Sequence, residues 1–285
     1  MRLTFLGTAA AEAYPNAFCD CTNCATSRER GGRHIRRRSA ALIDDTLIID
    51  HGPDIQWASA GLGIPLTNLH YALQTHEHSD HLDPLNFFAR SERVGVPNGI
   101  LMEWVATDGA VARTATIFGK ATLGGRDFRD AEVQRLFNVR HRTIAPWDEM
   151  SVGPYRIIAI PAVHDLTITP LLYGIERDGR RLLYATDTTT MPDETWNCLA
   201  ERGWRFDVVV MDHTFGTADR VTGHLNGAAF RGQLDTMRTR GLLADGARAY
   251  ATHIAHHSNP PHDELVELCA GWGYDVAWDG LAVDV

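Results

Sequence analysis

The sequence predicts an α/β fold with two β-sheets and helices on their outer faces, and three observations support this. Strand-like segments rich in Val, Ile and Leu occur at both ends of the chain and are mixed with helical segments. No low-complexity linker or internal repeat divides the 285 residues, a length that suits one large domain. Several of the strand-like segments end at a histidine or an aspartate. We therefore expect a single domain over residues 1–285 with one cleft, formed where these strands end.

The first predicted strand covers residues 1–8, and a cysteine-rich loop follows it. Three cysteines have a C-x-C-x-x-C spacing, namely Cys19, Cys21 and Cys24. This spacing suits a tetrahedral zinc ion that lacks one ligand, and four protein ligands would make the site structural. The candidates for the fourth ligand are His34, His256 and His257. The basic run at residues 28–38 is interpreted as solvated surface, with an arginine that orders the cysteine loop or binds a substrate phosphate as the alternative.

Residues 39–43 and 46–50 have the pattern of a β-hairpin. Asp50 ends its second strand, where it can orient a ligand histidine through a hydrogen bond. A helix is expected over residues 54–62 and a further strand over residues 68–74.

That strand leads into residues 75–81, T-H-E-H-S-D-H, which carry the densest set of potential metal ligands in the chain. Side chains at positions i and i+2 of an extended chain share one face, so His76 and His78 can bind the same ion. Asp80 and His81 follow as the backbone leaves the strand and can reach a second ion. Imidazole and carboxylate groups at this density predict a divalent metal site.

The segment at about residues 95–150 has the least regular pattern. Residues 82–93, which precede it, have helical spacing, whereas a strand at 99–105, a helix at 108–118 and a loop at 119–130 are expected within it. We expect part of this segment to cover the cleft and to contribute to substrate choice.

The association of strand ends with polar residues returns in the second half of the chain. Predicted strands at 156–160, 171–185 (a hairpin), 206–211 and 248–251 are followed by His164, Asp187, Asp212-His213 and His253, respectively. Helices are expected over 194–202, 228–239 and 264–271, and short strands over 274–279 and 281–285. Of these residues, His164, Asp187 and His253 would supply the remaining ligands of the metal site.

Two further histidines, His213 and His224, are placed near the predicted cleft but outside the ligand set. A histidine with a pKa near neutrality suits protonation of a leaving group. For His213, a capped surface position is the alternative interpretation.

The motif at residues 75–81 resembles the signature loop of the metallo-β-lactamase superfamily of binuclear metallohydrolases. The resemblance implies a four-layered αββα sandwich. It assigns His76, His78 and His164 to one metal, and Asp80, His81 and His253 to the other, with Asp187 bridging both. An aspartate rather than a cysteine at position 187 is similar to the superfamily members that cleave phosphoesters.

The cysteine loop and residues 252–256 are similar to the PhnP-type cyclic phosphodiesterases of the carbon–phosphorus lyase pathway. This resemblance implies that His256 completes the structural zinc site and that His224 assists cleavage. We assign catalytic roles to His224 and to the metal ligand Asp80. It also implies a small cyclic phosphodiester substrate, such as a 1,2-cyclic phosphoribose or a 2′,3′-cyclic nucleotide, with manganese often the active metal. The match covers nearly the whole chain, although residues 95–150 align poorly.

Other activities are compatible with the same motifs. Proteins of the pyrroloquinoline quinone biosynthesis type oxidise their substrate with iron, but a complete seven-ligand set favours hydrolysis. Lactone or thioester hydrolysis is a further alternative, because two metals also polarise carbonyls. A transfer-RNA 3′-processing nuclease is disfavoured by the acidic charge, and an intact ligand set disfavours a non-catalytic binding module. The ligand types accept zinc, manganese and iron alike.

The net charge of −9 argues against stable nucleic-acid binding, and the chain contains no apolar run long enough to span a membrane. The N-terminus lacks the pattern of a secretory signal, so a cytoplasmic location is expected. We expect a small-molecule substrate, and a homodimer as the commonest oligomer and the state that the family suggests.

Overall fold

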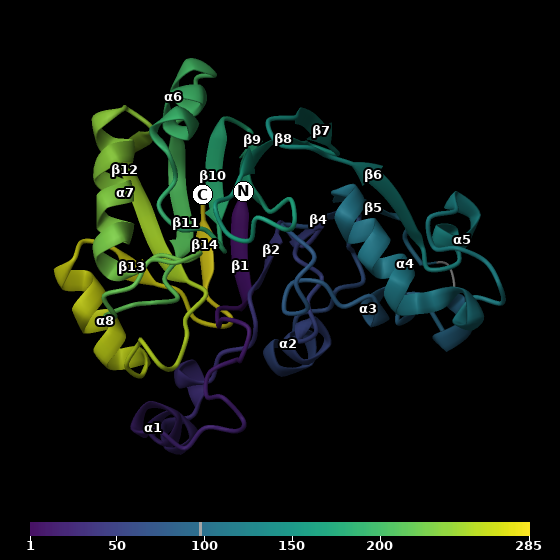
Figure 1. Ribbon diagram of the computed structural model, residues 1–285, viewed down its shortest axis with the longest axis horizontal. Coiled ribbons are helices and arrows are strands. Elements are labelled where there is room, and N and C mark those ends of the chain that lie inside the picture. The colour runs from purple at the N-terminus through teal and green to yellow at the C-terminus, as the bar shows by residue number, and fades with distance from the viewer. Residues whose placement is uncertain (97–98) are drawn as a thin grey trace.

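The computed structural model describes residues 1–96 and 99–285 and contains two β-sheets that pack face to face (Figure 1). The first sheet has the spatial order β14 (Ala282–Asp284), β1 (Arg2–Gly7), β2 (Ala40–Ile43), β3 (Leu47–Ile49), β4 (Tyr71–Leu73), β5 (Met102–Ala106) and β6 (Val139–Thr143). The second has the order β13 (Asp275–Val276), β12 (Leu243–Thr252), β11 (Phe206–Asp212), β10 (Arg180–Ala185), β9 (Leu171–Arg177), β8 (Tyr155–Pro161) and β7 (Glu149–Val152).

Helices cover the outer face of each sheet (Figure 1). Those beside the first sheet are α2 (Ile55–Leu62), α3 (Leu85–Phe88), α4 (Asp108–Thr122) and α5 (Ala131–Arg135). Those beside the second sheet are α6 (Asp193–Glu201), α7 (Gly227–Thr239) and α8 (His262–Gly271). A further helix, α1 (Thr22–Arg30), projects from the edge of the sandwich, and short 3-10 turns occur at Gly32–His34 and Glu92–Val94.

Alternating side chains within the strands separate the core into three layers. Ile49 packs between the two sheets, whereas Ile48 packs outward among residues of α2 and α4. In the second sheet, Val210 packs between the sheets and Val209 packs outward against α6, α7 and α8. Consecutive residues of a strand point to opposite faces, so strands that are apolar throughout are buried on both sides. This arrangement confirms the predicted αββα sandwich.

The two predicted hairpins are confirmed by their pairing. β2 and β3 run antiparallel with Leu42 opposite Ile48, and β9 and β10 run antiparallel with Ile175 opposite Leu182. After each hairpin the next strands run parallel, as β3 with β4 and β10 with β11 with β12. Parallel neighbours bring their carboxyl ends to the same edge of a sheet, which is why residues far apart in sequence meet there.

Several elements differ from the sequence-based predictions. The helix predicted over 82–93 is reduced to α3 and a 3-10 turn, and two of the residues that suggested a buried face, Leu85 and Phe88, are exposed. α4 continues to residue 122 across Gly119, where a loop was predicted. The prediction missed α1, α5, β6 and β7. The polar sequence of β6, Val-Arg-His-Arg-Thr, belongs to an edge strand that carries little hydrophobic signal.

The basic run at residues 28–38 is not simply solvated surface. Arg36 is buried and donates hydrogen bonds to the Thr8 hydroxyl and the Ala277 carbonyl. Arg37 pairs with Asp279, and Arg38 pairs with Asp54. These contacts tie the segment after the cysteine loop to both sheets. Over the described residues, no helix is both long and apolar enough to cross a membrane.

Candidate metal centre

The metal-binding motif lies in the loop that follows β4. The backbone turns back on itself here, since the amides of His81 and Leu82 both donate to the carbonyl of His78. This turn brings the buried imidazoles of His76 and His81 to within 4.3 Å of each other, centroid to centroid.

The other site residues come from the carboxyl ends of further strands. His164 follows β8, Asp187 follows β10, and His253 follows β12. Asp187 and His253 adopt left-handed backbone conformations with φ of 54° and 58°, as does Asp50 with 65°. Non-glycine residues rarely adopt this conformation because it is strained. Strained backbone at three positions of one site is typical of a functional site.

Potential ligand atoms fall into two overlapping groups. His76, His78 and His164 form the first, and Asp80, His81 and His253 form the second, with ligand atoms within 4.8 Å of one another in each group. Asp187 lies between the groups. One carboxylate oxygen of Asp187, Oδ1, is 3.6 Å from Nε2 of His164, while Oδ2 is 2.9 Å from Nε2 of His81 and 3.2 Å from Nε2 of His253. The structure therefore brings together all seven residues that the sequence predicted as ligands, with Asp187 positioned to bridge.

The second ring nitrogen of each histidine is held by a hydrogen-bond partner. The partners are Thr75 for His76, Asp165 for His78, Asp50 for His81, the Gly223 carbonyl for His164 and Thr214 for His253. Carboxylates and carbonyls only accept hydrogen bonds, and both threonine hydroxyls already donate elsewhere, to Asp50 and to the His253 carbonyl. Each ring therefore carries its proton on the outer nitrogen, and the inner nitrogen has a free lone pair. Metal-ligating histidines are oriented in this way.

The inward-facing atoms fit a metal centre. Four of these atoms are buried and have no partner of hydrogen-bond geometry among the residues that the structure describes, namely Nε2 of His76, His81 and His253 and Oδ2 of Asp187. Buried polar atoms without a partner cost free energy. Asp187 adds a carboxylate whose two oxygens face the inner nitrogens of His164, His81 and His253. Lone pairs and a carboxylate converging on two points are the donor set that divalent ions require.

His224 lies at the rim of this group. Its Nδ1 is 2.7 Å from Oδ2 of Asp212, and its ring stacks on His253 and meets His164 edge to face. Burial would lower the pKa of His224, but the Asp212 carboxylate outweighs burial and raises this pKa to about 9. His224 is therefore a protonated side chain next to the ligand set.

Asp212 and Thr214 are site residues that the sequence interpretation did not assign. Asp212 is fully buried and also accepts hydrogen bonds from the backbone amides of Asp187 and Leu225. Its place directly after a buried strand was the available signal in the sequence.

Both interpretations of His213, a position near the cleft and a capped surface position, are wrong. His213 is completely buried, and its ring nitrogens lie 2.9 Å from Oδ1 of Asn259 and 2.9 Å from the Tyr274 hydroxyl. The ring packs against Phe230, in the layer between the second sheet and its helices. Successive residues leave the strand in opposite directions, so Asp212 points into the site and His213 points away from it. Asp50, in contrast, accepts hydrogen bonds from His81 and Thr75, as its predicted orienting role requires.

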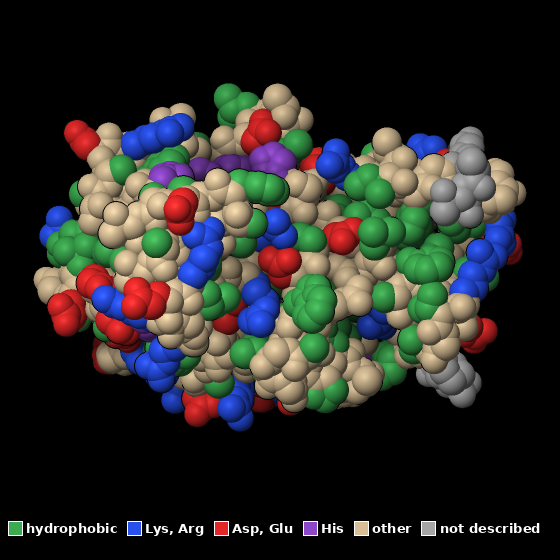
Figure 2. All heavy atoms as spheres, turned by 90° about the horizontal axis from the view of Figure 1, so that it is seen from below, with side chains coloured by type: hydrophobic (Ala, Val, Ile, Leu, Met, Phe, Trp, Pro, Cys, Tyr) green, Lys and Arg blue, Asp and Glu red, His purple; other side chains and the backbone are tan. Residues whose placement is uncertain are grey.

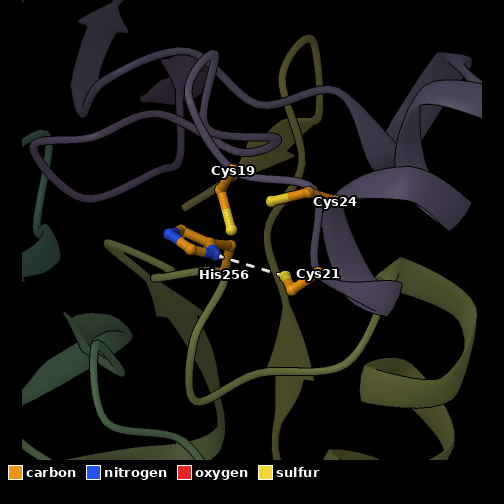
Figure 3. Close-up of side chains that lie close together, drawn as sticks. All are labelled: Cys19, Cys21, Cys24 and His256. Carbon is orange, nitrogen blue, oxygen red and sulfur yellow. Dashed lines mark hydrogen bonds between the residues drawn. The ribbon is translucent and has the colours of Figure 1, made fainter.

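A second ligand cluster is formed by the cysteine loop and the segment after β12. Sγ atoms of Cys19, Cys21 and Cys24 and a ring nitrogen of His256 lie within 4.8 Å of one another, and their side chains point toward one centre (Figure 3). A hydrogen bond from the backbone of Cys24 lowers the pKa of Cys21 to about 6, which favours the thiolate that binds metal. Among the three histidine candidates, the structure selects His256. His34 instead accepts from the amide of His262, and His257 contacts Ser258.

The metal-binding groups open onto a cavity of about 470 Å³. Figure 2 shows histidine side chains gathered in a hollow of the molecular surface. Arg220 and Phe215 also line the cavity, and the exposed Arg220 guanidinium lies 4.5 Å from the centre of the Phe215 ring. The residues that line the cavity all lie outside residues 95–150. A substrate-selecting role for that segment therefore stays a prediction.

The fold and the paired ligand sets define a metal-dependent hydrolase of the αββα class. Residues 46–254 match the family model described as the beta-lactamase superfamily domain, and the chain belongs to this family. Comparison with curated proteins gives no match.

Solved structures resemble the whole chain. A diphosphatase from the PhnP family superposes with a TM-score of 0.72 at 21% identity, covering 100% of this chain and 97% of the other. Zinc-bound PqqB from Methylobacterium extorquens gives a TM-score of 0.75 at 20% identity and covers 100% of both chains. The short form of human tRNase Z gives 0.64 at 14% identity, covering 100% of this chain and 99% of the other. At these identities the likeness establishes the fold.

Proposed function

We propose that the protein is a binuclear-metal phosphodiesterase that hydrolyses a small, cyclic phosphodiester. The placement of Asp187 carries this proposal, because its two oxygens face two separate histidine groups at short distance. The residues would hold one ion through His76, His78 and His164 and a second through Asp80, His81 and His253. When bound, such ions polarise a phosphate and lower the pKa of water towards neutrality.

The chain's own residues would complete the reaction. His224, held by Asp212, is protonated and lies beside the ligand set, so it is placed to give a proton to the leaving alkoxide. Arg220 forms no ion pair within the described part of the chain. It lines the same cavity, where a guanidinium suits a phosphate group.

We propose a 2′,3′-cyclic nucleotide or a 1,2-cyclic phosphoribose as the substrate type. The PhnP-family relative is described as a diphosphatase, and the tRNase Z relative bears the name of a nuclease, so phosphate chemistry recurs among proteins of this fold. Manganese or zinc would occupy the binuclear centre, and a structural zinc would occupy the cysteine cluster. A cytoplasmic homodimer without stable nucleic-acid binding is part of the same proposal.

A second candidate function is a reaction of the PqqB type or carbonyl hydrolysis. The reaction of the PqqB type is supported by the TM-score of 0.75 with zinc-bound PqqB over the full length of both chains. Lactones and thioesters are further candidates, because the same pair of metals can polarise a carbonyl.

The test is turnover of a 2′,3′-cyclic nucleotide and of a lactone, side by side, after manganese reconstitution. Asp80→Ala serves as the blank, because Asp80 belongs to the predicted ligand set. We expect phosphodiester cleavage that the blank lacks. Activity on the lactone alone would move the protein to carbonyl hydrolysis. Inactivity on both, with iron in the purified protein, would favour the oxidative alternative.

A further inference from the structure

A second cavity, of about 320 Å³, lies between α2 and the segment around α3. Its polar lining includes His51 and Arg90, and its apolar lining includes Ile55, Leu66 and Leu69. It shares no lining residue with the cavity at the metal-binding groups. Its volume falls at the lower end of the range of about 300–1,000 Å³ for small-molecule sites.

Arg90 is a half-buried cation that has no counter-ion among the described residues. Nη2 of its guanidinium donates to the Ile100 carbonyl at 2.8 Å, whereas its buried Nε has no hydrogen-bond partner in the described ranges, 1–96 and 99–285. No carboxylate of the described chain forms an ion pair with it, and burial lowers its pKa to about 10. Arg90 is still charged at neutral pH, and a charge that is partly withdrawn from water without a partner is costly. The contact with the Ile100 carbonyl does not neutralise the positive charge of Arg90.

His51 adds a second unsatisfied group to the same cavity. This residue is only 2% exposed, and its ring stacks on Phe87 at a centroid distance of 4.7 Å. Its Nδ1 has no hydrogen-bond partner within the described part of the chain. Burial, together with the nearby charge of Arg90, lowers the pKa of His51 to about 3. His51 is therefore neutral and can donate one N–H without adding charge.

Water could satisfy hydrogen bonds in this cavity, but it could not neutralise the charge of Arg90. A ligand that does both must carry a negative charge at one end. The apolar walls favour a ligand whose other end is hydrophobic. A planar carboxylate matches a guanidinium in two parallel hydrogen bonds.

We propose that this cavity is a binding site for a small organic carboxylate, with Arg90 holding the anionic end and the side chains of Ile55, Leu66 and Leu69 holding an apolar body. The site is separate from the metal centre, and the proposal does not depend on the proposed phosphodiesterase activity.

The experiment is a titration of the metal-loaded protein with benzoate, followed by calorimetry and by the side-chain Nε–H signals of arginine in ¹H–¹⁵N spectra. Benzamide, which has the same shape without the charge, is the matched ligand. We expect one equivalent of benzoate to bind and to shift the Arg90 signal, which is identified by its absence in Arg90→Gln. Benzamide should bind at least tenfold more weakly.

Two variants locate the site. Arg90→Gln should weaken benzoate binding at least tenfold, whereas Arg93→Gln, which changes an exposed arginine three positions further along, should leave it unchanged. His51→Phe keeps the stacking on Phe87 and should weaken benzoate binding by a smaller factor than Arg90→Gln does. It provides a second test of the site if Arg90→Gln does not fold. Absence of binding, equal binding of benzamide, or an unshifted Arg90 signal in the wild type would overturn the proposal.

Discussion

Thr75 and Thr214 occupy equivalent positions on the two sides of the metal centre. Each hydroxyl accepts an N–H from a ligand histidine, His76 or His253, and donates its own hydrogen to a fixed oxygen. A hydroxyl in this position fixes both the rotation of the ring and the nitrogen that carries the proton. The ligand geometry thus depends on residues that would never contact the metal.

We predict that Thr214→Val, which is close in shape but lacks the hydroxyl, weakens metal binding by about 10–100-fold. The physical reason is that His253 loses the acceptor that holds its ring. Metal titration of the variant checks this, with Thr214→Ser as the matched control that retains the hydroxyl and should bind like the wild type. Equal affinity in Thr214→Val would show that the hydroxyl is dispensable.

His224→Gln should leave both metals bound and slow the cleavage of substrates with poor leaving groups by about 10²–10⁴-fold. Protonation matters most for alkoxides of high pKa, so a substrate with a nitrophenolate leaving group should lose much less. Measuring kcat for both substrates, together with metal content, distinguishes a role of His224 in protonating the leaving group from a role in metal binding. Equal losses for good and poor leaving groups would contradict general-acid catalysis by His224.

The ligands themselves could be predicted because each follows a recognisable strand or motif, as His164 follows β8 and Asp187 follows β10. Their supporting residues could not. Asp165 and Thr214 reach the histidines through turns whose path is set by tertiary contacts, and neither lies in a motif. His213 was misassigned because the sequence does not state which way a side chain points once the strand has ended.

At the scale of elements, the cysteine loop and α1 connect the two ends of the chain. Asn23, in the first turn of α1, donates hydrogen bonds to the carbonyls of His256 and Asn259. His256 itself belongs to the cysteine cluster, only three residues after the metal-centre residue His253 (Figure 3). A zinc ion bound by this cluster would therefore fix the segment that also presents His253.

Cys21→Ser should lower the zinc content and the melting temperature. Loss of a few kcal/mol of stability corresponds to a decrease of about 5–10 °C in a chain of this size. Cys198→Ser is the matched control, because Cys198 lies on α6 outside the cluster, and it should keep the zinc. Metal analysis and thermal unfolding check both variants. Unchanged zinc in Cys21→Ser would remove this residue from the site.

Elements with strong apolar periodicity, such as the two hairpins, matched their predicted positions, whereas β6 and α5 were missed. β6 has only one fully buried side chain at its start, Val139, and its pattern resembles that of a polar loop. β6 has few buried side chains because it lies at the edge of the sheet, and this position is not visible before the sheet is assembled.

At the scale of the whole molecule, buried neutral histidines make stability depend on pH. His51 has its pKa lowered to about 3 by burial and by Arg90, whereas an unfolded histidine titrates near 6.5. Below pH 6.5 the unfolded chain binds a proton that the folded chain does not. The contribution of this residue is therefore complete above pH 6.5 and is lost as the pH falls towards 3.

We expect the stability of the wild type relative to His51→Phe to decrease by about 1.4 kcal/mol per pH unit between pH 6 and pH 4. Comparing the two proteins removes contributions that they share, including metal release in acid. Urea unfolding at several pH values measures this difference. A difference that does not vary with pH would contradict a buried, neutral His51.

The two-sheet architecture explains why one aspartate lies between two groups of potential metal ligands. Strands from both sheets deliver ligands to one edge, β4 from the first and β8, β10 and β12 from the second. Asp187 projects from β10 between the histidines of both groups. We therefore propose that Asp187 joins two metal ions into one centre.

The most direct test counts the metals in manganese-reconstituted protein with and without this carboxylate. The wild type should contain two manganese ions and one zinc ion per chain and should hydrolyse a 2′,3′-cyclic nucleotide. Asp187→Ala should lose at least one manganese ion and its turnover, keep its zinc and remain folded, while Asp235→Ala, a change at an exposed position of α7, should match the wild type. Full manganese occupancy with undiminished turnover in Asp187→Ala would contradict the account.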